Sequence, residues 1–131
     1  MTWSVKYNSA SKIVEVIYAG NVTGKEIQEA VKERVRMQKE HVSLFVLLDC
    51  SKVEHMAGGI MDVHTLPAEI YKNTKVERQT YHALVLSQFP QAREASFHYE
   101  TTCANRGWHV KCFDIYTDAV GWLTEEMTSS K

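Results

Sequence analysis

The stretch VSLFVLLDCSKVEHMAGGI, residues 42–60, changes character abruptly after Leu48. Its first part is a short and almost continuous apolar run, which is typical of a parallel β-strand covered on both faces. The polar sequence Asp-Cys-Ser follows directly at residues 49–51, and a pair of glycines stands at residues 58–59. Ligands of open α/β sheets bind beyond the carboxyl ends of the strands. We therefore expect the strand to end at Leu48 and residues 49–51 to lie at the rim of the sheet.

The residues before this strand predict a hairpin and a helix. Apolar and polar side chains alternate over residues 3–7. After a short polar turn a second run follows at residues 13–20, where Ile13, Glu15 and Ile17 take one face and Val14, Val16 and Tyr18 take the other. This is the pattern of an antiparallel β-hairpin. Thr23 and Glu26 have the spacing of a capping box, in which each side chain accepts a hydrogen bond from a free backbone N–H. The helix that they open should be amphipathic, with a buried face made of Ile27, Ala30, Val31 and Val35.

The residues after the central strand repeat the alternation of strands and helices. We expect a second buried strand at residues 83–86, a helix from Pro90 to a left-handed cap at Gly107, a strand within residues 108–116 and a last helix from Thr117. Parallel strands that are separated by helices need right-handed crossovers. The sequence therefore predicts an α/β fold, with an N-terminal β-hairpin followed by successive β-α units and a mostly parallel sheet, in the order ββαβαβαβα.

The composition predicts a single domain over residues 1–131 and argues against several classes of function. The net charge is −1 and the basic residues are scattered, so nucleic acid is not an expected partner. The longest apolar run, residues 44–48, is too short to cross a bilayer. The N-terminal MTWSVKYN lacks the pattern of a signal peptide, and three cysteines without a CxxC pair favour reduced thiols. We therefore expect a cytoplasmic protein without a membrane span.

The polar residues after the central strand match no complete phosphoryl-transfer motif. An aspartyl phosphotransferase would need a second aspartate two residues after Asp49, where Ser51 stands, and a cysteine phosphatase would need arginine six residues after Cys50, where Met56 stands. A P-loop would need lysine and a hydroxyl after its glycines, but Gly59 is followed by isoleucine and methionine. We expect Asp49 and Ser51 to cap a helix start or to satisfy loop amides. The alternative is a small enzyme that uses Cys50, or an Asp/His set, at these strand ends.

The histidines predict no metal site and no cofactor. None of them has HxxxH or HExxH spacing on an expected helix, although three-ligand sites can also be assembled across a fold. We interpret them as scattered surface or half-buried residues, at positions 41, 55, 64, 82, 98 and 109.

Residues 55–80 are the hardest part of the sequence to interpret. A short helix over residues 65–73 is expected, because Thr65 can cap it and Pro67 is tolerated in its first turn. Several apolar side chains in this segment form either ordinary core or a flexible patch for an apolar ligand or partner, namely Met56, Ile60, Met61, Val63 and Leu66.

Four short sequence patterns resemble the SpoIIAA-like branch of the STAS superfamily. They are W-x-V-x-Y at residues 3–7, YAGNVTGKEI at residues 18–27, VLLDCSKVEHM at residues 46–56 and FDIYTDAVGWL at residues 113–123. The resemblance implies a fold of successive β-α units after an initial antiparallel strand. The best-known members are cytoplasmic anti-sigma-factor antagonists, which bind a partner protein and are switched by phosphorylation of a serine at the start of the second helix.

In that family the phosphorylated serine lies in a pattern like M-D-S-S-G, a little beyond a strand that ends in aspartate. The matching place here reads Met-Ala-Gly-Gly-Ile at residues 56–60 and contains no hydroxyl. We therefore predict that a cognate kinase does not modify residues 56–60. Phosphorylation of Ser51 would mean that the switch lies elsewhere.

Together these observations predict a non-catalytic binding or regulatory module. Its partner would be a regulatory protein or a small apolar or anionic ligand, held by the strand-end loops and the second helix. A domain that acts mainly by forming a homodimer is a further possibility. The glycine pair could cradle an anion, although a plain loop is the commoner role of such a pair. The expected binding residues are Asp49, Ser51, Met56, Gly58, Gly59 and Ser87.

Overall fold

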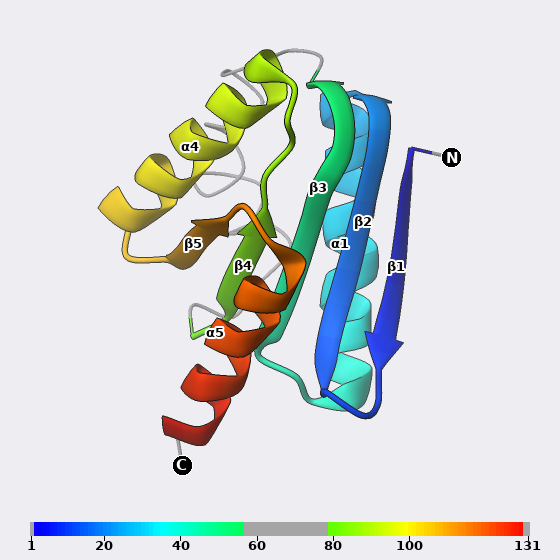
Figure 1. Ribbon diagram of the computed structural model, residues 1–131. Coiled ribbons are helices and arrows are strands. Elements are labelled where there is room, and N and C mark those ends of the chain that lie inside the picture. Colours follow the sequence, from blue (N-terminus) through cyan, green and yellow to red (C-terminus); the bar gives the residue numbers. More distant parts are fainter. Residues whose placement is uncertain (1, 57–78, 130–131) are drawn as a thin grey trace.

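A computed structural model of the protein describes residues 2–56 and 79–129 (Figure 1). The helix expected over residues 65–73 lies outside these ranges, and so do Gly58 and Gly59.

The described strands form one five-stranded sheet in the order β1-β2-β3-β4-β5. β1 pairs antiparallel with β2, and all later neighbours pair in parallel. The predicted α/β class, with its N-terminal hairpin and mostly parallel sheet, is therefore confirmed. The strands are β1 (Trp3–Asn8), β2 (Ile13–Val22), β3 (Phe45–Met56), β4 (Tyr81–Val85) and β5 (His109–Phe113).

Helices cover both faces of the sheet. α1 (Gly24–His41) and α4 (Pro90–Asn105) pack on one face, and their apolar side chains join those of all five strands in the larger core. α5 (Tyr116–Ser129) packs on the opposite face, over β3, β4 and β5. Figure 1 shows α1 behind the sheet and α5 in front of it. We call these two sides the α1/α4 face and the α5 face. Along each strand, alternate side chains point to opposite faces.

The start of α1 confirms the predicted capping box. The Thr23 Oγ1 atom accepts a hydrogen bond from the Glu26 amide at 3.2 Å, and Glu26 Oε1 accepts one from the Thr23 amide at 3.0 Å. The predicted buried side of α1 is confirmed as well, because its four apolar residues are all buried.

The end of α4 confirms the predicted left-handed cap. Gly107 has φ +80°, a conformation that costs glycine little. Its amide donates to the carbonyl of Ala104 at 3.1 Å, and the amide of Trp108 donates to the carbonyl of Cys103 at 2.9 Å. This pair of bonds is the Schellman arrangement, and it turns the chain directly into β5.

The central strand is longer than the sequence pattern predicts. We expected it to end at Leu48, but β3 continues to Met56, so Asp49 lies inside the strand rather than at the rim. Asp49 is opposite Ile17 on one side and opposite Val85, the last residue of β4, on the other. Beyond this point, within the part of the chain that the structure describes, β3 pairs with β2 alone, and its register slips twice. Each slip is a β-bulge, which inserts an unpaired residue and breaks the alternation that reveals a strand.

Val42, at the end of α1, is in a backbone conformation that its side chain disfavours. Its φ and ψ are +52° and +56°, and its side chain is 89% exposed. The left-handed region costs an L-residue about 1–2 kcal/mol, whereas glycine enters it freely. We expect Val42→Gly to raise the free energy of unfolding by about 0.5–1 kcal/mol, the rest being offset by the greater freedom of glycine in the unfolded chain. Urea unfolding of Val42→Gly and of the control Val42→Ala, which keeps the Cβ atom, measures the difference.

Candidate functional site

The structure places the described members of the predicted site on both faces of the sheet. Asp49 shares the α5 face with Leu47, because Leu48 and Cys50 on either side of it belong to the core of the α1/α4 face. Met56 lies on the α1/α4 face and is buried, as is Ser87, which follows β4. Ser51 is exposed. These four described residues therefore do not form one pocket.

Asp49 and Ser51 form a local clamp at the first bulge of β3. Asp49 Oδ1 accepts hydrogen bonds from the backbone amide of Ser51 at 3.0 Å and from its hydroxyl at 2.6 Å. Between the pairs Ile17–Asp49 and Ala19–Lys52, β3 has one more residue than β2. The carboxylate therefore satisfies an amide at the irregular point of the strand. This agrees with the predicted role of satisfying amides, although the amide belongs to a strand and not to a loop or a helix start.

Two side chains hold the far end of β3 against the start of α4. The Ser87 hydroxyl donates to the carbonyl of Val53 and accepts from the amide of Phe89 at 3.0 Å. The side-chain amide of Gln91 accepts from the Met56 amide at 2.8 Å and donates to the Met56 carbonyl at 3.1 Å. Gln91 thus supplies the hydrogen bonds that a neighbouring strand would give. The end of β3 is fixed in place although β4 has already stopped.

The fixed end of β3 displays a polar surface. The two bulges place apolar Val53 and Met56 in the core and leave the residues around them outside. Phe89, whose amide joins the hydrogen bonds of Ser87, is 47% exposed. We call the following exposed residues of β3 the β3-extension surface: Ser51, Lys52, Glu54 and His55.

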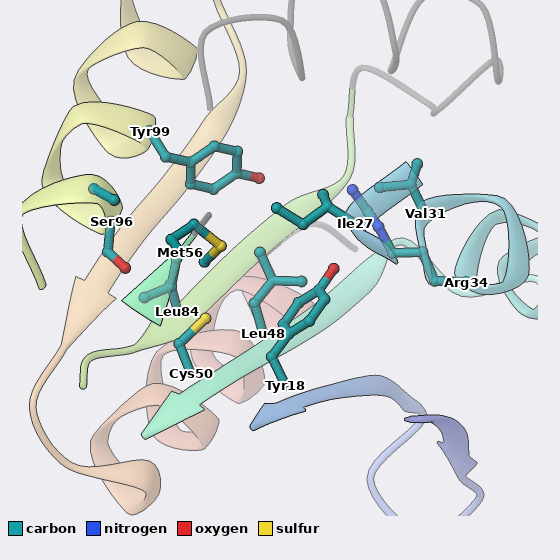
Figure 2. Close-up of a pocket in the computed structure, with 11 residues that line it drawn as sticks. Tyr18, Ile27, Val31, Arg34, Leu48, Cys50, Met56, Leu84, Ser96 and Tyr99 are labelled. Carbon is teal, nitrogen blue, oxygen red and sulfur yellow. The ribbon is translucent and has the colours of Figure 1, made fainter. Parts of the chain in front are cut away.

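A small cavity lies under the other side of β3, between α1 and α4. Figure 2 shows Tyr18, Tyr99 and Arg34 extending toward this space from β2, α4 and α1. Cys50 and Met56 also line it, and most of the remaining lining side chains are apolar. Its volume is about 40 Å³, which is enough for one or a few water molecules but far below the several hundred Å³ of a pocket for a drug-sized ligand.

The cysteines lack the features of a nucleophile. Burial, and secondarily the nearby carboxylate of Asp49, raises the pKa of Cys50 to about 12. Burial likewise raises the pKa of Cys103 to about 12, and it also raises the pKa of Cys112. The thiolate is the reactive form of cysteine. A pKa near 12 lowers the ionised fraction at pH 8 from about a quarter to about one part in ten thousand.

We therefore expect the native protein to react slowly with a thiol reagent such as DTNB at pH 8. Cys50 should react at least 100-fold more slowly than free cysteine, since it is both protonated and buried, and all three thiols should react at once in guanidinium chloride. Absorbance at 412 nm follows the reaction, and mass spectrometry of the quenched protein identifies the labelled residue. Labelling of Cys50 as fast as free cysteine would contradict this picture and would favour the enzymatic alternative.

One histidine differs from the sequence interpretation. His82 is fully buried on the α1/α4 face, and not half-buried or at the surface. Its Nδ1 atom is 3.1 Å from the carbonyl oxygen of His109, and its ring is edge-on to Trp108 with centroids 6.4 Å apart. Burial, together with the charge of Arg34, holds the pKa of His82 well below its usual value. The imidazole is therefore neutral, and it serves the packing of the core.

Within residues 2–56 and 79–129, no group of three or more His, Cys, Asp and Glu side chains is placed to hold a metal ion. No helix in the described part of the chain is long and apolar enough to span a membrane.

The sequence interpretation did not identify Gln91 or Phe89 as part of this region. Gln91 resembles an ordinary polar residue in the first turn of a helix, and its contact with Met56 spans 35 residues of sequence, so no local pattern reveals it. Phe89 could have been recognised from the sequence. A large apolar residue directly before the proline that opens a helix has few core positions available, so its side chain is expected to be exposed.

The fold is similar to that of two solved structures. An anti-sigma factor antagonist from Mycobacterium paratuberculosis is similar with a TM-score of 0.60 at 16% identity, over 93% of this chain and 92% of that one. An uncharacterized protein of the DUF3478 family from Shewanella loihica, described as having a SpoIIAA-like fold, gives a TM-score of 0.56 at 14% identity, over 92% and 91% of the two chains.

No protein-family model matches the sequence. No curated protein matches it either. The two structural relatives match more than 90% of this chain, and they show that this protein has a SpoIIAA-like fold.

Proposed function

We propose that the protein is a non-catalytic regulatory module of the cytoplasm that docks a partner protein through the β3-extension surface. The observation that carries this proposal is the rigid projection of β3 beyond β4. Ser87 and Gln91 fix its end by hydrogen bonds, while Lys52, Glu54 and His55 stay exposed and take no part in the core. A preorganised surface loses little conformational freedom on binding. The similarity in fold to a protein named an anti-sigma factor antagonist supports the same class of function.

Two observations favour a partner protein over the other expected roles. An enzyme that uses Cys50 would need a thiolate, but burial raises the pKa of this thiol to about 12. A small apolar ligand would need a larger space than the cavity beside Met56, whose volume is about 40 Å³. Protein recognition needs neither, because exposed charged and polar side chains at the rim of an interface set specificity and the rate of association.

We also propose that this module works without the phosphoserine switch of the anti-sigma-factor antagonists. The segment at residues 56–60 has no hydroxyl to accept a phosphate. Ser51 has one, but its oxygen lies 2.6 Å from a carboxylate oxygen of Asp49. A phosphate at this place would be repelled by that carboxylate.

The experiment compares two matched double variants. Lys52→Ala/Glu54→Ala removes one positive and one negative charge from the β3-extension surface, and Lys32→Ala/Glu29→Ala removes the same charges from the exposed side of α1. Immobilised wild type and both variants are exposed to extract of the source cells, and the retained proteins are quantified by mass spectrometry. The candidate partner is then purified, and its affinity for each form is measured by calorimetry.

We expect to find a protein that binds wild type and the Lys32→Ala/Glu29→Ala variant with equal affinity. It should bind the Lys52→Ala/Glu54→Ala variant at least 10-fold more weakly. Equal affinity for all three forms, equal loss in both variants, or no protein that binds purified wild type would contradict it.

A further inference from the structure

We propose that β1 is the place where two copies of this chain pair edge to edge, so that their sheets join into one across a two-fold axis at Val5. This inference concerns a different surface from the β3-extension surface and goes beyond the proposed function.

The outer edge of β1 carries backbone groups that point away from the sheet. In the described part of the chain, β1 is the last strand on one side of the sheet (Figure 1). The amide of Ala19 donates to the carbonyl of Thr2 at 2.9 Å, so the backbone of Thr2 faces β2. Backbone direction alternates along an antiparallel strand. The N–H and C=O groups of residues 3, 5 and 7 therefore point outward, while those of residues 4, 6 and 8 bind β2.

Within the described residues, this edge has few of the usual features that prevent strands from pairing. Proteins protect sheet edges with proline, bulges, charged side chains or a covering segment. β1 has the sequence WSVKYN, with Lys6 as its one charged residue, and it pairs with β2 in unbroken register over its whole length. The opposite edge differs, because the carboxylate of Glu100 on α4 accepts the outward amide of Cys112 on β5 at 2.7 Å. Glu100 thus occupies the hydrogen-bonding position that a carbonyl group of an added strand would need.

The outward groups of β1 are complementary to themselves. If Val5 lies opposite Val5 of the partner subunit, Trp3 lies opposite Tyr7 of the partner subunit, and each outward residue donates one hydrogen bond and accepts one. The side chains of Trp3, Val5 and Tyr7 are half-buried on the α1/α4 face, so pairing would cover the rest of their apolar surface. Aromatic residues that face each other across strands stabilise a sheet.

The side chains on the opposite face of β1 are also compatible with this pairing. Ser4 would lie opposite Lys6 of the partner subunit, so no two like charges face each other directly. Because both halves of the contact are made by the same patch, a two-fold axis closes it. These properties select a second copy of this chain as the occupant, in preference to a strand of another protein. One strand pair is a small interface, and we expect dissociation in the micromolar range.

The first test uses two variants that shorten the same side chain. Val5→Pro removes an outward N–H and places a ring at the edge, and it leaves the bonds to β2 intact because the Val5 amide does not face β2. Val5→Ala truncates the side chain but keeps the N–H. Sedimentation velocity over a range of concentrations should show wild type and Val5→Ala passing from 15.0 kDa to twice that mass, while Val5→Pro stays monomeric. Circular dichroism checks that both variants are folded.

The second test reads the register of the pair and does not depend on Val5→Pro being folded. Residues 4 and 6 of the two copies would form non-hydrogen-bonded pairs, whose Cα atoms lie about 4.5 Å apart and can be joined by a disulfide. Ser4→Cys and Lys6→Cys are prepared separately and oxidised alone and as a mixture. A covalent dimer should form in the mixture and not in either variant alone, and both variants contain the same three native cysteines as an internal control.

A wild type that stays at 15.0 kDa at every concentration would overturn the proposal. Equal dimerisation of folded Val5→Pro and Val5→Ala would overturn it, and so would equal cross-linking in the mixture and in the single variants. The Lys52→Ala/Glu54→Ala variant should dimerise like wild type, which separates this contact from the proposed docking of a partner.

Discussion

Replacing Leu123 with alanine is expected to lower the free energy of unfolding by about 2–5 kcal/mol. Leu123 lies on α5, the described helix that covers the α5 face, and its side chain is 0% exposed. It packs in one cluster with Leu47 and Val85 of the sheet, which are also buried. This cluster is much smaller than the core of the α1/α4 face, so few neighbours can move to fill the space left by the lost side chain. The cavity should therefore remain, and its cost adds to the lost burial.

Urea unfolding followed by circular dichroism measures this effect. Leu44→Ala is the control, because Leu44 is 38% exposed and belongs to neither core cluster; we expect a cost of about 1 kcal/mol or less for it. Equal losses in the two variants would mean that α5 contributes little to the stability of the sheet, and would contradict the packing described here.

Acidification below pH 6.5 is expected to lower the free energy of unfolding, and His82 by itself should account for up to about 1.4 kcal/mol for each pH unit. Burial first, and the charge of Arg34 second, holds the pKa of His82 well below 6.5 in the folded protein. In the unfolded chain the imidazole has its ordinary pKa. Between these two values the unfolded state binds more protons than the folded state, so stability rises with pH in this window. The contribution of His82 to the free energy of unfolding is therefore complete above pH 6.5, and it is lost as the pH falls toward the pKa of His82 in the folded protein.

The measurement is the free energy of unfolding at several values between pH 7.5 and pH 5, for wild type and for His82→Gln. The variant loses the ring contacts with Trp108 and should be less stable at every pH. Its stability should nevertheless depend less steeply on pH than that of wild type, because glutamine does not titrate. Parallel curves for the two proteins would show that the pKa of His82 is the same in the folded and the unfolded protein, contrary to its buried position.

The sequence predicted those parts of the fold whose signals are local. The capping box at Thr23 and Glu26 and the cap at Gly107 depend on residues only a few positions apart, and the structure confirms both. The length of β3 was predicted wrongly for a specific reason. Cys50, Val53 and Met56 all point into the same core although they are three residues apart, because each of the two bulges adds one residue. The expected alternation of two is absent there, so the strand resembles a polar loop.

The contacts of the candidate site could be predicted only in part. Asp49 and Ser51 are only two residues apart in sequence, and the role of Asp49 in satisfying an amide followed from its residue type. Gln91 binds a strand end from another helix, and the sequence carries no mark of that pairing. His82 could have been placed better, because Leu84 is a core residue and a position two residues earlier on the same strand points the same way. The buried strand expected at residues 83–86 therefore implied that His82, the residue directly before it, is buried as well.

In the proposed pair, the hydrogen bond from Cys112 to Glu100 would also limit the assembly to two copies. A sheet with two free edges can add further copies at both ends and grow into a fibre. Within the described residues, the β5 edge is already occupied at Cys112 by the chain's own carboxylate, so a pair joined at β1 would offer no second edge for another copy. One carboxylate on a helix would thus set a finite stoichiometry.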